Sequence, residues 1–234
     1  MSAMPAMEFL TAESAKSTTY FPIVLLESIS WHTYESLLQD LSGKAGTRLT
    51  YIKGYLEISM APLSLLHSES TALLDRFITI LAEELNLNVH GLDAITLRRQ
   101  DLQSGLEPDK AYYIQHESSL RAITNRQEFL DLTQLPPPDL VVEVDITSHS
   151  LNKLPSYLAL GIPEVWRYDG KNLYIYQLSG EKYLTGTMSP TFAHLPLVNS
   201  IPQLMTQSYA QGQIAVLREF RRWVKNPTEF FQSN

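Results

Sequence analysis

The sequence of 234 residues contains no cysteine. This absence excludes disulfide bonds, cysteine-ligated zinc sites and thiol catalysis together. Glycine is also scarce, at 10 residues, and no glycine-rich loop that could cradle a phosphate is present. No Gly-x-Ser-x-Gly motif occurs, which removes the nucleophile elbow of the α/β-hydrolases.

Long apolar runs and an excess of basic charge are missing as well. No stretch of about 18 uncharged apolar residues occurs, so we expect no transmembrane helix. Glu8 and Glu13 interrupt any signal-peptide pattern, and a cytoplasmic protein is the default expectation. Lys and Arg number 18 against 25 Asp and Glu, for a net charge of -7, which argues against a dedicated nucleic-acid binder. A nuclease can still be acidic, because a metal site concentrates carboxylates.

The composition that is present fits one large globular domain. Hydrophobic residues make up 44% and charged residues only 18%, which suits a chain with a real core and not a disordered one. We expect residues 1–20 to be a flexible leader and residues 21–234 to be a single domain. Its core is expected over about residues 48–180, with a C-terminal helix over about residues 213–225.

Apolar periodicity predicts the elements of this domain. Helical spacing predicts helices over residues 31–41, 64–85, 151–160 and 213–224. Short β-branched or alternating runs predict strands over residues 49–52, 55–60, 94–98, 110–115, 140–146, 165–168 and 172–177. We expect a hairpin turn at Lys53-Gly54, a turn around Ser104-Gly105, a short helix or insertion over residues 125–132, and a proline-containing loop before the last helix. This order predicts an α/β fold with a mixed central sheet between helices.

The strand over residues 140–146 carries charges that a buried strand normally excludes. It reads Leu-Val-Val-Glu-Val-Asp-Ile, and its Glu143 and Asp145 lie at period two, so they point to the same face. Buried carboxylates are costly unless they are paired or bind a metal. With Asp109 upstream and Lys153 downstream, the pattern indicates a metal-dependent nuclease site.

Magnesium or manganese is the ion that such a site predicts, because both prefer oxygen ligands. If the strands of Asp109 and Glu143 pair, the two carboxylates can meet at one metal. The ion would lower the pKa of a bound water and polarise a phosphoryl oxygen, and Lys153 would orient that water or stabilise the developing charge. Glu57, inside another apolar strand, and His67, at the start of the long helix, form a second tier with Asp145 at the wall of the site.

Each of these residues also has a plainer interpretation, since charged groups are usually solvated or paired. Asp109 follows a proline and fits an ordinary turn. Glu143 fits an ion pair with a buried arginine, and Asp145 fits a strand end that faces solvent. Lys153 fits a solvated helix residue, and His67 fits a cap or core histidine.

At these residues the chain resembles the Uma-type (Uma two) family, restriction-endonuclease-like proteins of the PD-(D/E)xK superfamily. The matching pieces span roughly residues 30–180: Gly54 with Glu57, His67, Glu107-Pro108-Asp109, Pro138-Asp139-Leu140-Val141-Val142-Glu143-Val144, Lys153 with Tyr157, and Gly161-Ile162-Pro163-Glu164-Val165-Trp166. The resemblance implies a restriction-endonuclease-like core, a divalent metal and phosphodiester hydrolysis. By this analogy Asp109 and Glu143 are metal ligands and Lys153 is the catalytic lysine.

The chain departs from the superfamily pattern at one position. The usual Glu-x-Lys triplet would place a lysine at position 145, where this chain has Asp145. Lys153 would have to reach back into the site from the following helix, which its long flexible side chain permits.

Three functions remain open on the sequence. The first is a magnesium-dependent endonuclease with DNA as its substrate. The second is a non-enzymatic binding or dimerisation protein that keeps the nuclease fold, and the third is a metal-dependent hydrolase of small phosphoesters. A homodimer is a further expectation, with Trp166, Tyr174 and Tyr176 either on the dimer face or in the core.

Overall fold

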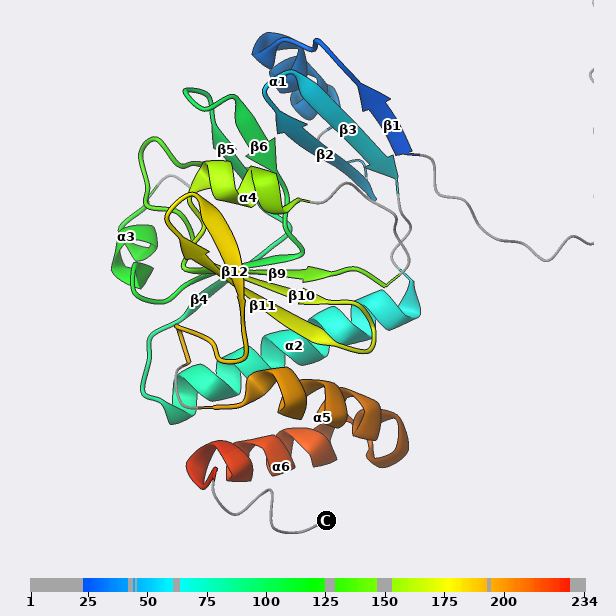
Figure 1. Ribbon diagram of the computed structural model, residues 1–234, viewed down its shortest axis with the longest axis vertical. Coiled ribbons are helices and arrows are strands. Elements are labelled where there is room, and N and C mark those ends of the chain that lie inside the picture. The colour runs from blue at the N-terminus through cyan, green and yellow to red at the C-terminus, as the bar shows by residue number, and fades with distance from the viewer. Residues whose placement is uncertain are drawn as a thin grey trace, which may run out of the picture.

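The structure, a computed structural model, describes residues 23–41, 44, 46–60, 64–124, 129–146, 153–192 and 195–227. These residues form a mixed α/β fold with two six-stranded sheets and with helices outside and between them (Figure 1). The α/β class predicted from the sequence is confirmed. The strands are divided between two sheets, where one central sheet was expected.

The first sheet has the strand order β1-β3-β2-β6-β5-β8. Its strands are β1 Ile23–Leu26, β2 Thr47–Ile52, β3 Tyr55–Met60, β5 Thr96–Arg99, β6 Ser104–Leu106 and β8 Phe129–Asp131. The predicted hairpin of β2 and β3 is present, and φ at its turn residues Lys53 and Gly54 is 46° and 92°. Positive φ at both positions gives the turn a twist that matches the strands. Helix α1, Trp31–Asp40, covers one face, where Tyr34 stacks on Tyr51 at 4.8 Å between ring centroids.

The second sheet has the order β12-β11-β10-β9-β7-β4. Its strands are β4 His90–Asp93, β7 Lys110–Tyr113, β9 Leu140–Val144, β10 Glu164–Tyr168, β11 Leu173–Ser179 and β12 Lys182–Gly186. Strands β9 and β10 are parallel and therefore need a crossover, which helix α4, Leu154–Leu160, provides. Pro155 fits the first turn of α4, and Gly161 ends the helix with a left-handed φ of 72°.

Three long helices lie on the outer side of the second sheet, and the last of them packs on the other two (Figure 1). They are α2 Leu65–Glu84, α5 Leu197–Gln211 and α6 Gln213–Lys225, while the short α3, Glu117–Arg121, follows β7. The core beneath them takes Leu140, Val142 and Val144 of β9, and Phe77 of α2 meets Phe220 of α6 with ring centroids 4.6 Å apart. Ser64 caps α2, since its Oγ accepts from the N–H of His67.

A second core lies between the two sheets. Val141 and Val165 of the second sheet pack there with Tyr157 of α4 and Leu97 of the first sheet. Side chains alternate along a strand, so Glu143, two residues after Val141, points to this inner side. Helices α2 and α4 thus cover opposite faces of the second sheet, as predicted, and Glu143 lies on the α4 side.

Three expectations about local structure are wrong. Strand β6 occupies the expected turn at Ser104-Gly105, and β8 occupies part of the segment expected as a helix or insertion. Gly105 is required in β6 because a Cβ there would lie 2.3 Å from Tyr34 Oη. Helix α5 replaces the expected proline-containing loop, and its Pro202 is tolerated inside a helix whose inner side chains are buried.

Other expectations fall outside what the structure describes. The expected leader over residues 1–20, residues 125–128 and residues 151–152 are not among the described residues. The division into a leader and a single domain therefore stays a prediction. In the described ranges no helix combines the length and the apolar character that crossing a membrane requires.

Candidate active site

Asp109 and Glu143 lie on adjacent strands of the second sheet. Strands β7 and β9 pair antiparallel with Lys110 opposite Val142, and extending this register by one residue places Asp109 opposite Glu143. The strands next to Asp109 and Glu143 therefore pair, which is the condition under which the two carboxylates can meet at one metal. Asp109 Oδ2 also accepts from the backbone N–H of Val144 at 2.7 Å, so the carboxylate is fixed at the end of β9.

Asp109 is buried and surrounded by cationic and donor groups. Its side chain is 2% exposed, Arg48 Nη1 of β2 forms an ion pair with Oδ1, and His67 Nε2 of α2 lies 3.2 Å from the same oxygen. Burial opposes ionisation, but the hydrogen bond from His67 and the charge of Arg48 outweigh it and hold the pKa of Asp109 well below its usual range. Asp109 is therefore a carboxylate at neutral pH, and although it lies at a bend before β7, its side chain is buried and paired.

Glu143 receives its partners from α4. Lys153 Nζ lies 3.0 Å from Oε1 and 2.9 Å from Oε2, and Tyr157 donates its hydroxyl to Oε1. Burial raises the pKa of Glu143, and the charge of Asp109 adds to the rise while Lys153 opposes it. Lys153 is only 16% exposed at its side chain, so the interpretation as a solvated helix residue is wrong. The ion pair of Glu143 is with a lysine, where the plainer interpretation expected an arginine.

Glu107 is a third carboxylate in this cluster, and the sequence indicated it only as part of the Glu-Pro-Asp motif. Arg48 Nε lies 3.4 Å from Glu107 Oε1. Burial raises the pKa of Glu107, Arg48 and Lys153 lower it, and the charges of Asp109 and Glu143 raise it again. We call Glu107, Asp109 and Glu143 the acidic centre.

Arg48 is the residue of this cluster that sequence reasoning missed. The signal was present in β2, where Leu49 and Tyr51 alternate with Arg48 and Thr50. The apolar pair packs on α1, so Arg48 lies on the opposite face, toward the second sheet. The sequence could not show what Arg48 meets there, because its partners come from the other sheet.

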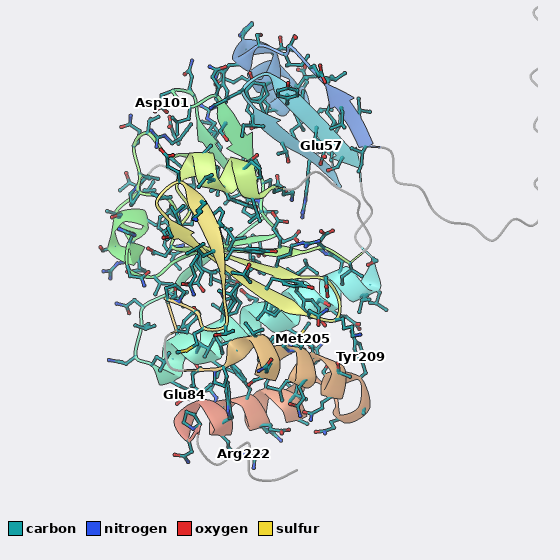
Figure 2. The ribbon with its side chains drawn as sticks, viewed as in Figure 1. Glu57, Glu84, Asp101, Met205, Tyr209 and Arg222 are labelled. Atoms are coloured by element: carbon teal, nitrogen blue, oxygen red, sulfur yellow. The ribbon has the colours of Figure 1, made fainter. Side chains whose placement is uncertain are left out.

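The remaining predicted wall residues are placed differently. His67 contacts Asp109, as described above. Glu57 is buried on β3 opposite Thr50, so it shares the inner face of the first sheet with Arg48. Figure 2 shows Glu57 on this upper sheet, at the opposite end of the molecule from Glu84. Asp145 forms an ion pair with Arg167, Nη2 to Oδ2 at 2.8 Å, so it does not simply face solvent.

The donor set of the acidic centre fits a hard divalent cation by its chemistry. Carboxylate oxygens are the ligands that magnesium and manganese prefer, and Asp109 and Glu143 supply them from adjacent strands. Three carboxylates face two fixed cations, Arg48 and Lys153, which leaves one negative charge uncompensated. In the described ranges no group of three His, Cys, Asp or Glu side chains is arranged to hold an ion, so protein ligands beyond Asp109 and Glu143 are not implied.

The aromatic residues expected at a dimer face divide between two environments. Trp166 is 0% exposed and packs against Phe192, so the core interpretation is correct for it. Tyr174 and Tyr176 are half-buried on β11 and stack on each other. Trp166 therefore contributes no surface to a partner.

Comparison with known proteins adds two findings. The model of the Uma2 family, which is described as "Putative restriction endonuclease", matches residues 31–208. Among solved structures, the chain is similar to "a putative nuclease belonging to DUF820 from Anabaena variabilis ATCC 29413", with 15% sequence identity and a TM-score of 0.44, over 72% of this chain and 90% of that chain. No curated protein matches the chain.

Proposed function

The chain belongs to the Uma2 family, and we propose that it is a divalent-metal-dependent endonuclease that hydrolyses DNA phosphodiester bonds at the acidic centre. One observation carries this proposal. Asp109 and Glu143, two buried carboxylates on adjacent strands, lie beside a lysine whose ammonium group is within 3.0 Å of Glu143. Burying a carboxylate costs free energy unless it is paired or binds a metal, so two buried carboxylates in one cluster support a site of chemistry.

The proposed roles follow from these contacts. Asp109 and Glu143 would hold Mg²⁺ or Mn²⁺, which when bound lowers the pKa of a water molecule and neutralises charge on the phosphate. His67 fixes one oxygen of Asp109, and Tyr157 fixes one oxygen of Glu143. Lys153 would orient the attacking water and stabilise negative charge that develops on the phosphate oxygens.

The displaced lysine is compatible with these roles. Position 145 holds an aspartate that is engaged by Arg167, so the strand offers no ammonium group to the centre. Lys153 reaches both oxygens of Glu143 from the residue that precedes α4. We propose that it replaces the lysine of the usual triplet.

A second candidate is a non-enzymatic binding or dimerisation protein. The observation in its favour is that Arg48 pairs with Asp109 and Lys153 pairs with Glu143. In that case the cluster is a buried ion-pair network that ties α4 and the two sheets together. Binding of a metal ion separates the two candidates.

The test combines metal binding with cleavage. The melting temperature of wild type should rise with Mg²⁺ or Mn²⁺, because an ion that binds only the folded site stabilises it by mass action. Supercoiled plasmid and duplex oligonucleotides should be cut at low salt, and EDTA should stop the reaction. Lys153→Ala should lower the rate about 10²- to 10³-fold, the usual loss for a transition-state contact. The control is Lys171→Ala, which removes the same charge at an exposed turn.

The outcomes discriminate among the functions. Equal cleavage by wild type and Lys153→Ala would remove Lys153 from the reaction. Metal binding without DNA cleavage, but with hydrolysis of a small phosphodiester, would support the third function. Absence of both metal binding and cleavage would support the non-enzymatic candidate and a dimer, which size-exclusion chromatography with light scattering would test.

A further inference from the structure

Arg48 and Glu107 are the most exposed side chains of the cluster around the acidic centre. Their side chains are 24% and 22% exposed, against 2% for Asp109 and 12% for Glu143. Arg48 comes from β2 of the first sheet, whereas Asp109 and Glu143 belong to the second sheet. Arg48 is therefore a partly exposed cation in direct contact with Asp109 of the acidic centre.

We propose that Arg48 binds the phosphate group of the substrate at the acidic centre, an inference that rests on the proposed nuclease function. A guanidinium group carries five N–H donors in one plane, and its geometry suits two oxygens of one phosphate. The contacts described for Arg48 use Nη1 toward Asp109 and Nε toward Glu107. Glu107 holds the guanidinium at Nε, and Asp109 holds it at Nη1 beside the proposed metal ligands.

The charges of the cluster support this role. Glu107, Asp109 and Glu143 carry three negative charges, and Arg48 and Lys153 carry two positive ones. When Asp109 and Glu143 ligate a divalent cation, the cluster has one net positive charge, which one phosphodiester anion matches. Asp109 then no longer depends on Arg48 for neutralisation, and the guanidinium can exchange this carboxylate for a phosphate.

A purely structural role for Arg48 makes different predictions. As a fixed counter-ion of Asp109, Arg48 would keep the carboxylate in place, and its removal would weaken metal binding together with the fold. As a phosphate ligand that competes with the ion for Asp109, its removal should leave metal affinity equal or higher. The two roles also differ in DNA binding, because only a phosphate contact contributes to the salt dependence of affinity.

The experiment measures metal binding and DNA binding separately. Mg²⁺ or Mn²⁺ alone is titrated into Arg48→Ala, and binding is measured by calorimetry and thermal melting. The metal affinity of Arg48→Ala should be at least equal to that of wild type. Fluorescence anisotropy with a labelled duplex oligonucleotide in Ca²⁺ should show affinity lower by about 10- to 100-fold, as for the loss of a charged hydrogen bond. The slope of log K against log salt concentration should become shallower by about 0.9, the value for one phosphate contact.

Two variants serve as controls. Arg98→Ala removes the same charge from the first sheet at a similar side-chain exposure of 20%, but Arg98 pairs with Glu35 and not with the acidic centre. It should leave the salt slope unchanged. Arg48→Lys should keep the slope of wild type, since the charge remains, but should recover only part of the affinity because an ammonium group is a poor substitute for the planar fork.

The failures of the two proposals are distinguishable. If wild type binds the duplex but Arg48→Ala shows the same slope, or if Arg48→Ala binds metal more weakly, the role of Arg48 is wrong and the nuclease proposal stands. If wild type does not bind the duplex at any salt concentration, the proposed function is wrong and the role of Arg48 is wrong with it.

Discussion

The ion pair of Glu143 and Lys153 should contribute measurably to stability when no metal is bound. The perturbation is a double-mutant cycle of Glu143→Gln, which keeps an acceptor for Tyr157, and Lys153→Met, which keeps most of the lysine stem. Both side chains are largely buried, at 12% and 16% exposure, with nitrogen–oxygen distances of 2.9 and 3.0 Å. Each single variant leaves a charge without its partner.

The expected magnitude lies between two limits. Breaking a buried ion pair costs about 3–5 kcal/mol, and breaking an exposed pair costs about 0–1 kcal/mol. A freed lysine can turn its ammonium group to water, so we expect about 2 kcal/mol for Glu143→Gln. In a chain of 234 residues this loss lowers the melting temperature by about 4–8 °C. The coupling energy from the cycle should be about 1–2 kcal/mol.

The assay is urea unfolding in EDTA at neutral pH, with the Arg99–Asp101 pair as the reference. That pair has a nitrogen–oxygen distance of 2.5 Å but exposures of 30% and 49%, so its coupling energy should be smaller than that of Glu143 and Lys153. A coupling energy between Glu143 and Lys153 no larger than that of the reference pair would refute the reasoning from burial.

Three further predictions address the metal site, the packing and the pH dependence. Glu143→Gln should abolish the rise in melting temperature with Mg²⁺ or Mn²⁺, because a ligand oxygen loses its charge. The control Glu181→Gln, at an exposed position, should keep the rise. A rise retained in Glu143→Gln would contradict the assignment of Glu143 as a metal ligand. Gly105→Ala should lower the free energy of unfolding by about 1–3 kcal/mol through overpacking, because its Cβ would lie 2.3 Å from Tyr34 Oη. Adding Tyr34→Phe should recover part of this loss. No recovery in the double variant would mean that the strain lies in the backbone. Burial opposes ionisation of Glu84, but hydrogen bonds from Arg221 and Lys225 outweigh it and lower the pKa of Glu84. The ionised Glu84 therefore contributes stability above its unfolded-state pKa, and this contribution is lost as the pH falls through its folded-state pKa. Glu84→Gln should lose less stability than wild type between neutral and acidic pH, and equal losses would contradict the pairing.

The elements predicted from the sequence are those with a strong local pattern. The stripe of α2, the Lys53-Gly54 turn and the proline and glycine that bound α4 each encode their element within a few residues. Helix α5 was missed because Pro196 and Pro202 indicate a loop, whereas its stability comes from buried side chains such as Ile201 and Leu204 that pack on distant elements. Strand β6 was missed because Gly105 resembles a turn residue until Tyr34 is placed above it.

The candidate site was predictable to the extent that its residues break the pattern of their own element. Glu143 interrupts an apolar strand, and this interruption led to Asp109 and Lys153 as neighbours. Arg48 and Glu107 do not break their patterns in the same way, and their proximity depends on how the first sheet packs over the second. Such packing joins residues about 60 positions apart, and no local period encodes it.

The position of the lysine has a physical explanation in the contacts of β9 and β10. Arg167 lies opposite Glu143 in the parallel register and pairs with Asp145. A lysine at position 145 would remove the partner of Arg167 and place two cations side by side, which is unfavourable in a half-buried site. The residue before α4 avoids this conflict, because Lys153 reaches Glu143 from above the strand together with Tyr157 of the same helix. Helix α4 thus delivers both the ammonium and the hydroxyl group to one carboxylate, while Asp145 remains available to Arg167.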